Sequence, residues 1–423
     1  MESPALLVIA IAVIGYGLYS RVFARWSLTA PMIFTALGLV MSSAVSGLLG
    51  FEITAHQIKL LAEITLILVL FSDAAGVDIR LLRADESIPA RMLILGLPLA
   101  MVLGTITARL LLPDLGLIQC ALLAVVLAPT DAALSRSVIV NETVPLRIRQ
   151  TINAESGLND GLALPAVFIL IALASPGDQS PEGIAWAGFI AQQIVLGTAA
   201  GVIFGWLVGK ALERSDRKNA ISPEFERISA VALAIGAYVA ALMMGGNGFI
   251  AAFTAGGALG VVARRARGEM QRFGETEGQL LALLTFLAFG AVMLPDALQN
   301  WSWNGAVFAL ASLFIIRPVA IALSLTGSGL TWPTRLFLGW FGPRGLASIV
   351  FVLLIDLQLG HAFAAPLIAI ASLTIGTSII LHGLSAGPLG QAYANWLSQR
   401  GDRAALKEFT KAEAGSDLRR SRH

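Results

Sequence analysis

The sequence predicts an all-α, polytopic membrane protein, and three observations support that prediction. Charged residues make up 13% of the 423-residue chain and hydrophobic residues 56%, whereas a soluble domain carries about 25% charged residues. The apolar residues are gathered in runs of the roughly 20 residues that a helix needs to cross a bilayer. These runs are continuous rather than alternating, which excludes the strands of a membrane β-barrel.

Thirteen apolar segments are expected to cross the membrane as helices. Several of them run longer than a simple span because they contain breaks. In chain order they cover residues 4–22, 30–49, 58–77, 89–112, 116–139, 149–174, 184–211, 226–245, 247–264, 279–296, 303–325, 334–358 and 362–386.

Basic residues indicate how these segments are oriented. If the segments alternate in direction, all but four of the 29 Lys and Arg residues fall on one face of the membrane. Lys59 and Arg109 lie near the other face, and Arg317 and Arg344 lie inside segments. Because cytoplasmic loops are enriched in Lys and Arg, we expect a multi-pass protein of the cell (inner) membrane with its N-terminus outside and its C-terminus in the cytoplasm.

Composition and motifs exclude several other classes of protein. The single cysteine, Cys120, excludes a disulfide framework and a Cys-based metal site. The four histidines are scattered along the chain and form no ligand cluster. No phosphate-binding GxxxxGKS or GxGxxG loop is present, which argues against an ATP-driven pump. We therefore expect no cofactor and no nucleic-acid partner.

Charged residues inside the apolar segments are the first candidates for function, because a charge in the bilayer is costly. Five are carboxylates and two are arginines, which need a counter-charge. The candidates are Glu63, Asp73, Asp131, Glu155, Asp160, Arg317 and Arg344.

The sixth segment holds two of these carboxylates on different faces of one helix. With 3.6 residues per turn, Asp160 shares a face with Ser156 and Asn159, whereas Glu155 points roughly 140° away from Asp160. Two faces suggest two roles. Glu155 is interpreted as the permanent partner of one of the two intramembrane arginines, and Asp160 as a carboxylate that is free to titrate.

Two segments contain residues that interrupt a helix. Pro129 precedes Thr130 and Asp131 in the middle of the fifth segment, and the run GPRG occupies positions 342–345 of the twelfth. Proline removes a backbone donor and clashes with the preceding turn. Irregular backbone at membrane depth is tolerated where it is buried in protein or lines a cavity. A pair of interrupted segments in corresponding halves of a transporter indicates the substrate site.

The two interrupted segments are seven positions apart in the order of segments, and this odd offset predicts inverted repeats. The first repeat would cover about residues 4–174 and the second about residues 226–386, with a linking helix at about 184–211. Together they would form a transmembrane domain over residues 1–390, followed by a short cytoplasmic tail at 391–423.

The polar groups near the first break supply oxygen atoms only. The carboxylate of Asp160 with the hydroxyl groups of Thr130 and Ser156 would form a singly charged oxygen site. Such a site suits a hard monovalent cation such as Na⁺ or Li⁺. A proton and a cation would compete for the same carboxylate, so a site that faces each side in turn would exchange one for the other.

Seven runs of sequence follow one another from the third to the thirteenth segment. They are LFSDAAGVDIRLLR, APTDAALSRSVI, VPLRIRQTINAESGLNDGLALP, NGFIAAFTAGG, IRPV, GPRGLAS and LHGLSAGPLG. In this order they resemble the monovalent cation:proton antiporters of the NhaP/NHE type. The combination of ESGLND with GPRG is specific, and the resemblance covers nearly the whole membrane part of the chain.

This resemblance implies a Na⁺/H⁺ antiporter with thirteen helices that assembles as a homodimer in the lipid bilayer. Helices 4–6 and 11–13 would form a mobile core in which helices 5 and 12 are unwound and cross. Asp160 would be the proton carrier and the ligand of the transported cation. Asp73 falls on the acidic residue that helix 3 contributes, and Asn159 preceding Asp160 implies electroneutral exchange.

The remaining roles follow from the same resemblance. Asp131 and Asn159 would shape the crossing of the broken helices. Glu155 would form a structural ion pair with Arg344 or Arg317, and the sequence does not decide between the two arginines.

Secondary active exchange of a monovalent cation for H⁺ by alternating access is therefore the expected function. A K⁺/H⁺ antiporter of the same fold stays open, because the residues indicate an oxygen site but not its radius. A cation channel is less favoured, since no TVGYG-type filter is present. An enzyme is not expected, because the sequence contains no HExxH motif and Ser156 has no histidine close to it in sequence.

Overall fold

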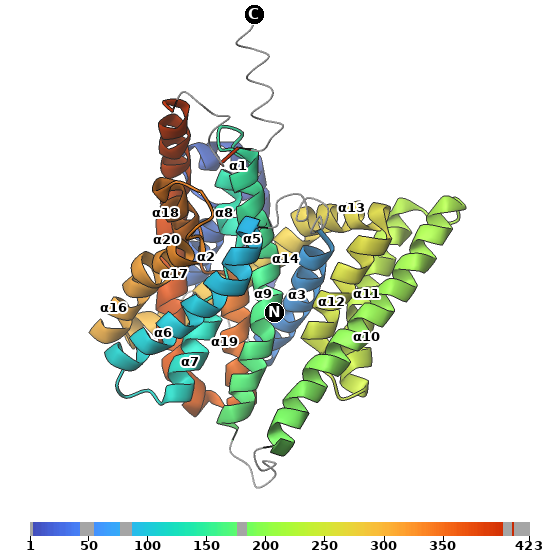
Figure 1. The fold of residues 1–423 in the computed structure, drawn as a ribbon, viewed down its shortest axis with the longest axis horizontal. Coiled ribbons are helices and arrows are strands. Elements are labelled where there is room, and N and C mark those ends of the chain that lie inside the picture. The colour runs from blue at the N-terminus through green and yellow to red at the C-terminus, as the bar shows by residue number, and fades with distance from the viewer. Residues whose placement is uncertain (1–2, 43–54, 77–86, 176–183, 401–407, 410–423) are drawn as a thin grey trace, which may run out of the picture.

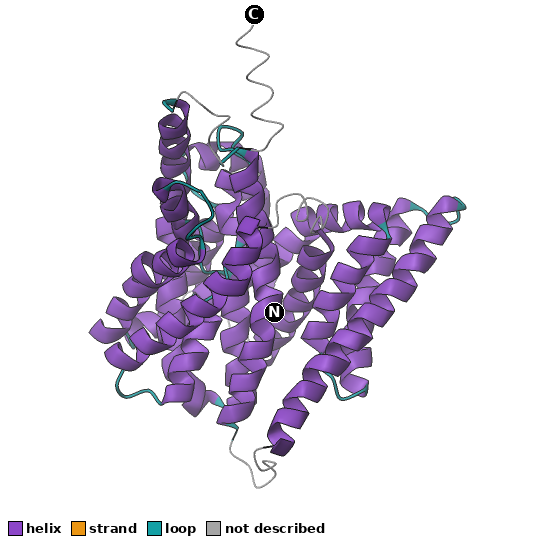
Figure 2. Cartoon of the chain, in the orientation of Figure 1, coloured by secondary structure: helices purple, strands orange, loops and turns teal. Residues whose placement is uncertain are grey.

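The computed structural model describes residues 3–42, 55–76, 87–175, 184–400 and 408–409. Within these ranges the chain forms helices and connecting loops, and no strand occurs there (Figure 2). The first ten elements are α1 (Ser3–Arg25), α2 (Ala30–Met41), α3 (Ala55–Gly76), α5 (Ser87–Arg91), η1 (Met92–Gly96), α6 (Leu97–Leu111), α7 (Leu117–Val126), α8 (Ala132–Ile139), α9 (Leu146–Ala174) and α10 (Ile184–Arg217). The others are α11 (Pro223–Met243), α12 (Gly248–Val262), α13 (Arg264–Phe273), η2 (Gly274–Gly278), α14 (Gln279–Ala288), η3 (Phe289–Met293), α15 (Leu294–Gln299), α16 (Trp303–Ala311), η4 (Ser312–Ile316), α17 (Arg317–Ser324), α18 (Trp332–Trp340), α19 (Leu346–Leu359) and α20 (His361–Ser398).

All of the predicted segments coincide with helices. Seven helical stretches in the described part are long and apolar enough to cross a membrane, and five shorter apolar helices accompany them. Residues 43–49 of the second predicted segment, residue 77 of the third, and residues 401–407 and 410–423 of the predicted tail lie outside the described ranges. The last helix, α20, continues to Ser398, into the region predicted as a tail. The all-α, polytopic membrane fold predicted from the sequence is thus confirmed.

The helices lie in two groups that meet along α9 and α3 (Figure 1). One group contains α6 to α9 and α16 to α20. The other contains α3 and α10 to α13, with α10 and α11 at the outer edge of the view. Because α9 contacts α7 and α8 in its own group and α3 and α12 in the other, side chains on α9 can face either group.

Small residues bring α12 directly against α3. A β-carbon at Gly256 would lie 2.1 Å from the carbonyl oxygen of Phe71, and one at Gly260 would lie 2.5 Å from that of Ala75. Small residues allow this kind of close backbone approach between membrane helices. Since Asp73 lies between these two contact points on α3, its position relative to α12 is fixed.

The fifth and twelfth predicted segments are both broken. In the fifth, α7 ends at Val126 and α8 begins at Ala132; in the twelfth, α18 ends at Trp340 and α19 begins at Leu346. The stretches that interrupt these helices contain Pro129 and the GPRG run, respectively. The two predicted breaks are therefore confirmed.

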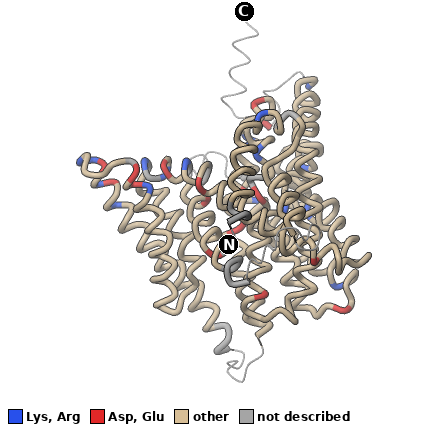
Figure 3. Tube along the Cα trace, turned by 180° about the vertical axis from the view of Figure 1, so that it is seen from behind, with Lys and Arg blue, Asp and Glu red and all other residues tan. Residues whose placement is uncertain are grey.

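Charged residues gather at the helix ends, notably at those of α10, α11 and α13 (Figure 3). Arg227 pairs with Glu269 at 3.1 Å, and Arg265 pairs with Glu226 at 3.4 Å and also with Asp216. The arginines of these pairs are partly exposed, whereas Glu226 and Glu269 are buried. The joined pairs fix how these helix ends lie. This is the arginine-rich end of the helices that the sequence assigns to the cytoplasm.

The chain returns to this end at residues 408 and 409. Glu408 is buried, and its carboxylate accepts hydrogen bonds from the Thr331 backbone N–H at 3.0 Å and from the hydroxyl groups of Thr331 and Thr334 at 2.6 and 2.9 Å. Burial opposes ionisation of the Glu408 carboxyl, but these hydrogen bonds outweigh it and lower its pKa below the ordinary value. A carboxylate therefore caps the start of α18, where it also complements the helix dipole.

Candidate cation-binding site

The two breaks cross and hold each other in place. The backbone N–H of Asp131 donates to the carbonyl of Pro343 at 2.8 Å, and the backbone N–H of Leu346 donates to Oδ2 of Asp131, also at 2.8 Å. The Asp131 carboxylate thus caps the N-terminus of α19, where a negative charge complements the helix dipole. A β-carbon at Gly345 would lie 2.0 Å from this Oδ2, so the close approach requires glycine.

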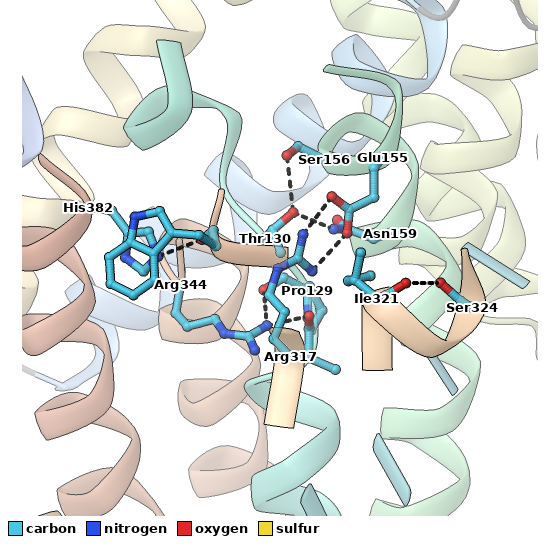
Figure 4. Close-up of polar contacts among 12 residues, drawn as sticks. Pro129, Thr130, Glu155, Ser156, Asn159, Arg317, Ile321, Ser324, Arg344 and His382 are labelled. Carbon is cyan, nitrogen blue, oxygen red and sulfur yellow. Dashed lines mark hydrogen bonds and ion pairs between the residues drawn. The ribbon is translucent and has the colours of Figure 1, made fainter. Parts of the chain in front are cut away.

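Arg344 performs the reciprocal task at the end of α7. This arginine is buried, and its guanidinium donates to the carbonyl groups of Ala128 and Pro129 (Figure 4). Those carbonyls have no partner within the helix because α7 ends there. A positive charge at a helix C-terminus is favourable, so Arg344 stabilises the first break as Asp131 stabilises the second.

Arg317 is the partner of Glu155. Its two terminal nitrogens donate to the two carboxylate oxygens at 2.9 and 2.8 Å (Figure 4). Glu155 is 2% exposed and Arg317 is 3% exposed. The arginine follows directly on the π-helical turn η4, and its side chain passes so close to the second break that a β-carbon at Gly342 would lie 1.5 Å from its Nε. The pair therefore joins α9, α17 and the break before α19.

Three polar side chains meet between α9 and the first break. Asn159 donates from Nδ2 to the hydroxyl of Thr130 at 2.7 Å, and that hydroxyl lies 3.0 Å from the hydroxyl of Ser156 (Figure 4). All three residues are buried. The side-chain amide oxygen of Asn159, Oδ1, has no hydrogen-bond partner among the described residues. This cluster places several oxygen atoms of α9 and of the break together.

Asp160 follows this cluster on α9. It is 7% exposed, and its Oδ1 makes no hydrogen bond within the described part of the chain. The carboxylates of Asp73, Asp131 and Glu155 all interact electrostatically with it. An acidic group in this environment is stabilised by binding a cation or a proton, because a buried charge without a counter-charge is costly.

Asp73 and Phe253 approach the same face of α9 from the other helix group. A β-carbon at Gly157 would lie 3.9 Å from the Asp73 β-carbon, and one at Gly161 would lie 2.3 Å from the ring of Phe253. Gly157 and Gly161 are four residues apart and lie on one side of α9. Asp160 is three residues after Gly157 and directly precedes Gly161. Asp160 therefore lies at the boundary between the two groups of helices.

His382 connects the second break to α20. One ring nitrogen lies 2.9 Å from the carbonyl oxygen of Trp340 and the other 3.1 Å from the Ser378 hydroxyl, which in turn accepts from the backbone N–H of Arg344 at 2.7 Å. The His382 ring also stacks on Trp340. This role of His382 could not be predicted from the sequence, because a single histidine on an apolar helix gives no sign of a partner 42 positions away.

The structure brings the predicted site residues together around the two breaks and α9. Thr130, Ser156 and Asn159 form one hydrogen-bonded cluster, and Asp73 reaches α9 from α3. The carboxylate of Asp131, by contrast, is engaged with the backbone of α19. The two glycines flanking the Arg344 break were not predicted as site residues, although their position beside a buried arginine was a usable signal.

A polytopic helical fold with two crossing breaks beside a buried carboxylate is typical of secondary membrane transporters. The family model described as sodium/hydrogen exchanger, transmembrane, matches residues 8–392. The chain therefore belongs to the sodium/hydrogen exchanger family, as the resemblance of its motifs indicated.

Two proteins that are similar in sequence to this chain are named as K(+)/H(+) antiporters. The K(+)/H(+) antiporter NhaP of Alkalimonas amylolytica is 25% identical over 376 residues, which are 87% of this chain and 62% of that protein. The K(+)/H(+) antiporter NhaP2 of Shewanella oneidensis is 26% identical over 278 residues, 64% of this chain and 47% of that protein. The chain thus spans about half to three-fifths of the length of these curated relatives.

The fold is that of a solved archaeal structure. The sodium proton antiporter MjNhaP1 of Methanocaldococcus jannaschii superposes with a TM-score of 0.74 at 20% sequence identity, covering 92% of this chain and 98% of that one. This likeness shows that the two proteins share a fold.

Proposed function

We propose that this protein is a secondary active antiporter that exchanges a monovalent cation for H⁺ by alternating access. The observation that supports this most strongly is Asp160, a buried carboxylate whose Oδ1 has no hydrogen-bond partner in the described structure, next to two crossing helix breaks. A cation and a proton each neutralise that charge, so one group would carry either but not both at once.

In this proposal the neighbouring residues have separate roles. Thr130 and Ser156 would supply hydroxyl oxygens to the cation, and Asp73 would add a second carboxylate from α3. Asn159 would orient the Thr130 hydroxyl through its hydrogen bond. No enzymatic step and no cofactor is part of this mechanism.

The crossing of the breaks supplies the rigid frame for this site. Asp131 and Arg344 neutralise the ends of the half-helices, and the Glu155–Arg317 pair ties α9 to α17. These elements would move as one unit against α3 and α12, which present Asp73 and Phe253 to the same face of α9. That movement would expose Asp160 to each side of the membrane in turn.

The proposed stoichiometry is one cation for one proton. If a single carboxylate binds either ion, no net charge crosses the membrane in a full cycle. We further propose that the protein lies in the inner membrane with its N-terminus outside, because the arginine-rich ends would then face the cytoplasm. We also propose that it assembles as a homodimer, as the resemblance of its motifs implies.

Na⁺ or Li⁺ is the first proposed cation, because the site offers hard oxygen ligands. K⁺ is the second candidate, and the observation that favours it is the name of the relatives from Alkalimonas and Shewanella, which are K(+)/H(+) antiporters.

The test is dissipation of a preset pH gradient in proteoliposomes on addition of Na⁺, Li⁺ or K⁺. We expect at least one cation to collapse the gradient, Asp160→Asn to abolish this, and Asp114→Asn, a change at an exposed loop carboxylate, to leave it intact. A wild-type protein that is folded yet inactive with all three cations over a wide pH range would contradict the proposal.

A further inference from the structure

A cavity of about 490 Å³ opens between the two groups of helices, away from the crossing breaks. It lies at the C-terminal ends of α9 and α19, reached at Ser175 and Gln358, and at the turn between α11 and α12, reached at Gly246. These ends are opposite to the arginine-rich ends. In the proposed orientation the cavity therefore faces the outside.

The wall of this cavity is mostly apolar and carries one negative charge. Glu63 on α3 is the only acidic or basic residue among the described residues that line it. The hydroxyl of Tyr238 on α11 donates to the Glu63 carboxylate, which holds the charge at the wall. Apolar, low-dielectric walls focus the field of such a charge and raise the local concentration of counter-ions.

Aromatic rings adjoin this carboxylate. The ring centroid of Tyr238 lies 5.1 Å from that of Phe249 in an edge-to-face contact, and Phe249 stacks on Phe168 at 6.2 Å. All three line the cavity. Ring faces attract cations through their quadrupole, so rings and carboxylate favour the same sign of ion.

The cavity leads toward Asp160. Of the α9 residues that line the cavity, Pro165 is nearest to Asp160 along the chain. At 1.5 Å per residue it lies about 7.5 Å along the helix from Asp160. On α12, Phe249 lines the cavity, and Phe253, one turn further, packs on Gly161. The cavity therefore ends one to two helical turns from Asp160, with the ring of Phe253 packed against Gly161, the residue that follows Asp160.

We propose that this cavity is an outer capture site for monovalent cations, in which Glu63, held by Tyr238, concentrates the ion before it reaches Asp160. This rests on the proposed antiport function and adds a second, more weakly binding carboxylate on the outer path. Because Glu63 acts through its charge at a distance from Asp160, it affects how readily the cation arrives and leaves the later steps unchanged.

The first experiment measures the apparent KM for the transported cation separately from each side, in right-side-out and inverted vesicles. Glu63→Gln raises the KM from the cavity side about 3- to 10-fold, leaves the maximal rate within a factor of two, and leaves the KM from the arginine-rich side unchanged. The increase shrinks at high ionic strength because salt screens the charge. Tyr238→Phe, which keeps the carboxylate, gives a smaller increase.

Glu142→Gln is the matched control, since Glu142 is an exposed carboxylate in the loop between α8 and α9 at the arginine-rich end. It leaves the cavity-side KM unchanged. A Glu63→Gln protein with an unchanged cavity-side KM, or with the same increase on both sides, would overturn the capture site while leaving antiport intact.

The second experiment does not depend on transport. Gln193 lines the cavity, and a Gln193→Cys protein, with Cys120→Ser to remove the natural thiol, is modified from outside with cationic and anionic thiol reagents. Glu63→Gln lowers the ratio of cationic to anionic modification rates several-fold. An unchanged ratio overturns the capture site even if the protein exchanges ions, and a lowered ratio in a protein without exchange supports the capture site while antiport fails.

Discussion

Removal of the Glu155 carboxylate is expected to destabilise the protein severely. Glu155→Ala leaves the Arg317 guanidinium at 3% exposure without the two hydrogen bonds of 2.9 and 2.8 Å that now satisfy it. Breaking a buried ion pair by deleting one partner costs about 3–5 kcal/mol. Arg344 cannot replace the lost carboxylate, because it is positively charged like Arg317. Its guanidinium also already donates to the carbonyl groups at the end of α7.

That cost corresponds to a change of about a hundred- to several-thousand-fold in the ratio of folded to unfolded protein. The assay is thermal unfolding of the purified protein in detergent, with the double variant Glu155→Leu/Arg317→Met as the comparison. Replacing both members of a buried pair by apolar residues is often neutral, so the double variant should melt well above Glu155→Ala. A single variant that melts like wild type, or a double variant no better than the single one, would refute the reasoning.

Three further predictions concern other parts of the account. Asn159→Asp should make exchange sensitive to membrane potential, worth about 2.3 kcal/mol per charge per 100 mV; potassium–valinomycin clamping of proteoliposomes measures this, and continued insensitivity would remove the proposed role of the asparagine. Gly342→Ala should abolish exchange and lower Tm, because its β-carbon would lie 1.5 Å from the Nε of Arg317, whereas Gly257→Ala, with nothing within 4 Å, should behave like wild type in both assays. Glu408→Gln should lower Tm at neutral pH: the folded-state pKa of Glu408 is lowered, so its stabilisation is present above the unfolded-state pKa and is lost as pH falls through the folded value. The difference in Tm from wild type should therefore shrink below about pH 4, and a difference independent of pH would count against the ionised cap.

The breaks and the spans could be predicted because their causes are local. An apolar run of sufficient length is its own signal for a membrane helix, and Pro129 and the GPRG run disrupt helices wherever they occur. The two faces of α9 followed from helical spacing alone. Accordingly, Glu155 and Asp160 have different surroundings in the structure. Glu155 is paired with Arg317, whereas Oδ1 of Asp160 makes no hydrogen bond within the described residues.

The choice of partners could not be predicted, because it depends on how distant helices cross. Glu155 and Arg317 are 162 positions apart, and Arg344 was an equal candidate until its guanidinium was seen at the end of α7. The Asp131 carboxylate lies within the predicted site, yet its contact with α19 spans 215 positions. Sequence spacing on one helix carries no information about such contacts.

The central claim is that the Asp160 carboxylate binds either a proton or the transported cation. The most direct test is proton release from purified, weakly buffered protein on addition of the cation that drives exchange, with binding measured in parallel by titration calorimetry. We predict close to one proton released per cation bound, and neither release nor binding for Asp160→Asn. Cation binding without proton release, or release that persists in Asp160→Asn, would contradict the claim that one carboxylate serves both ions.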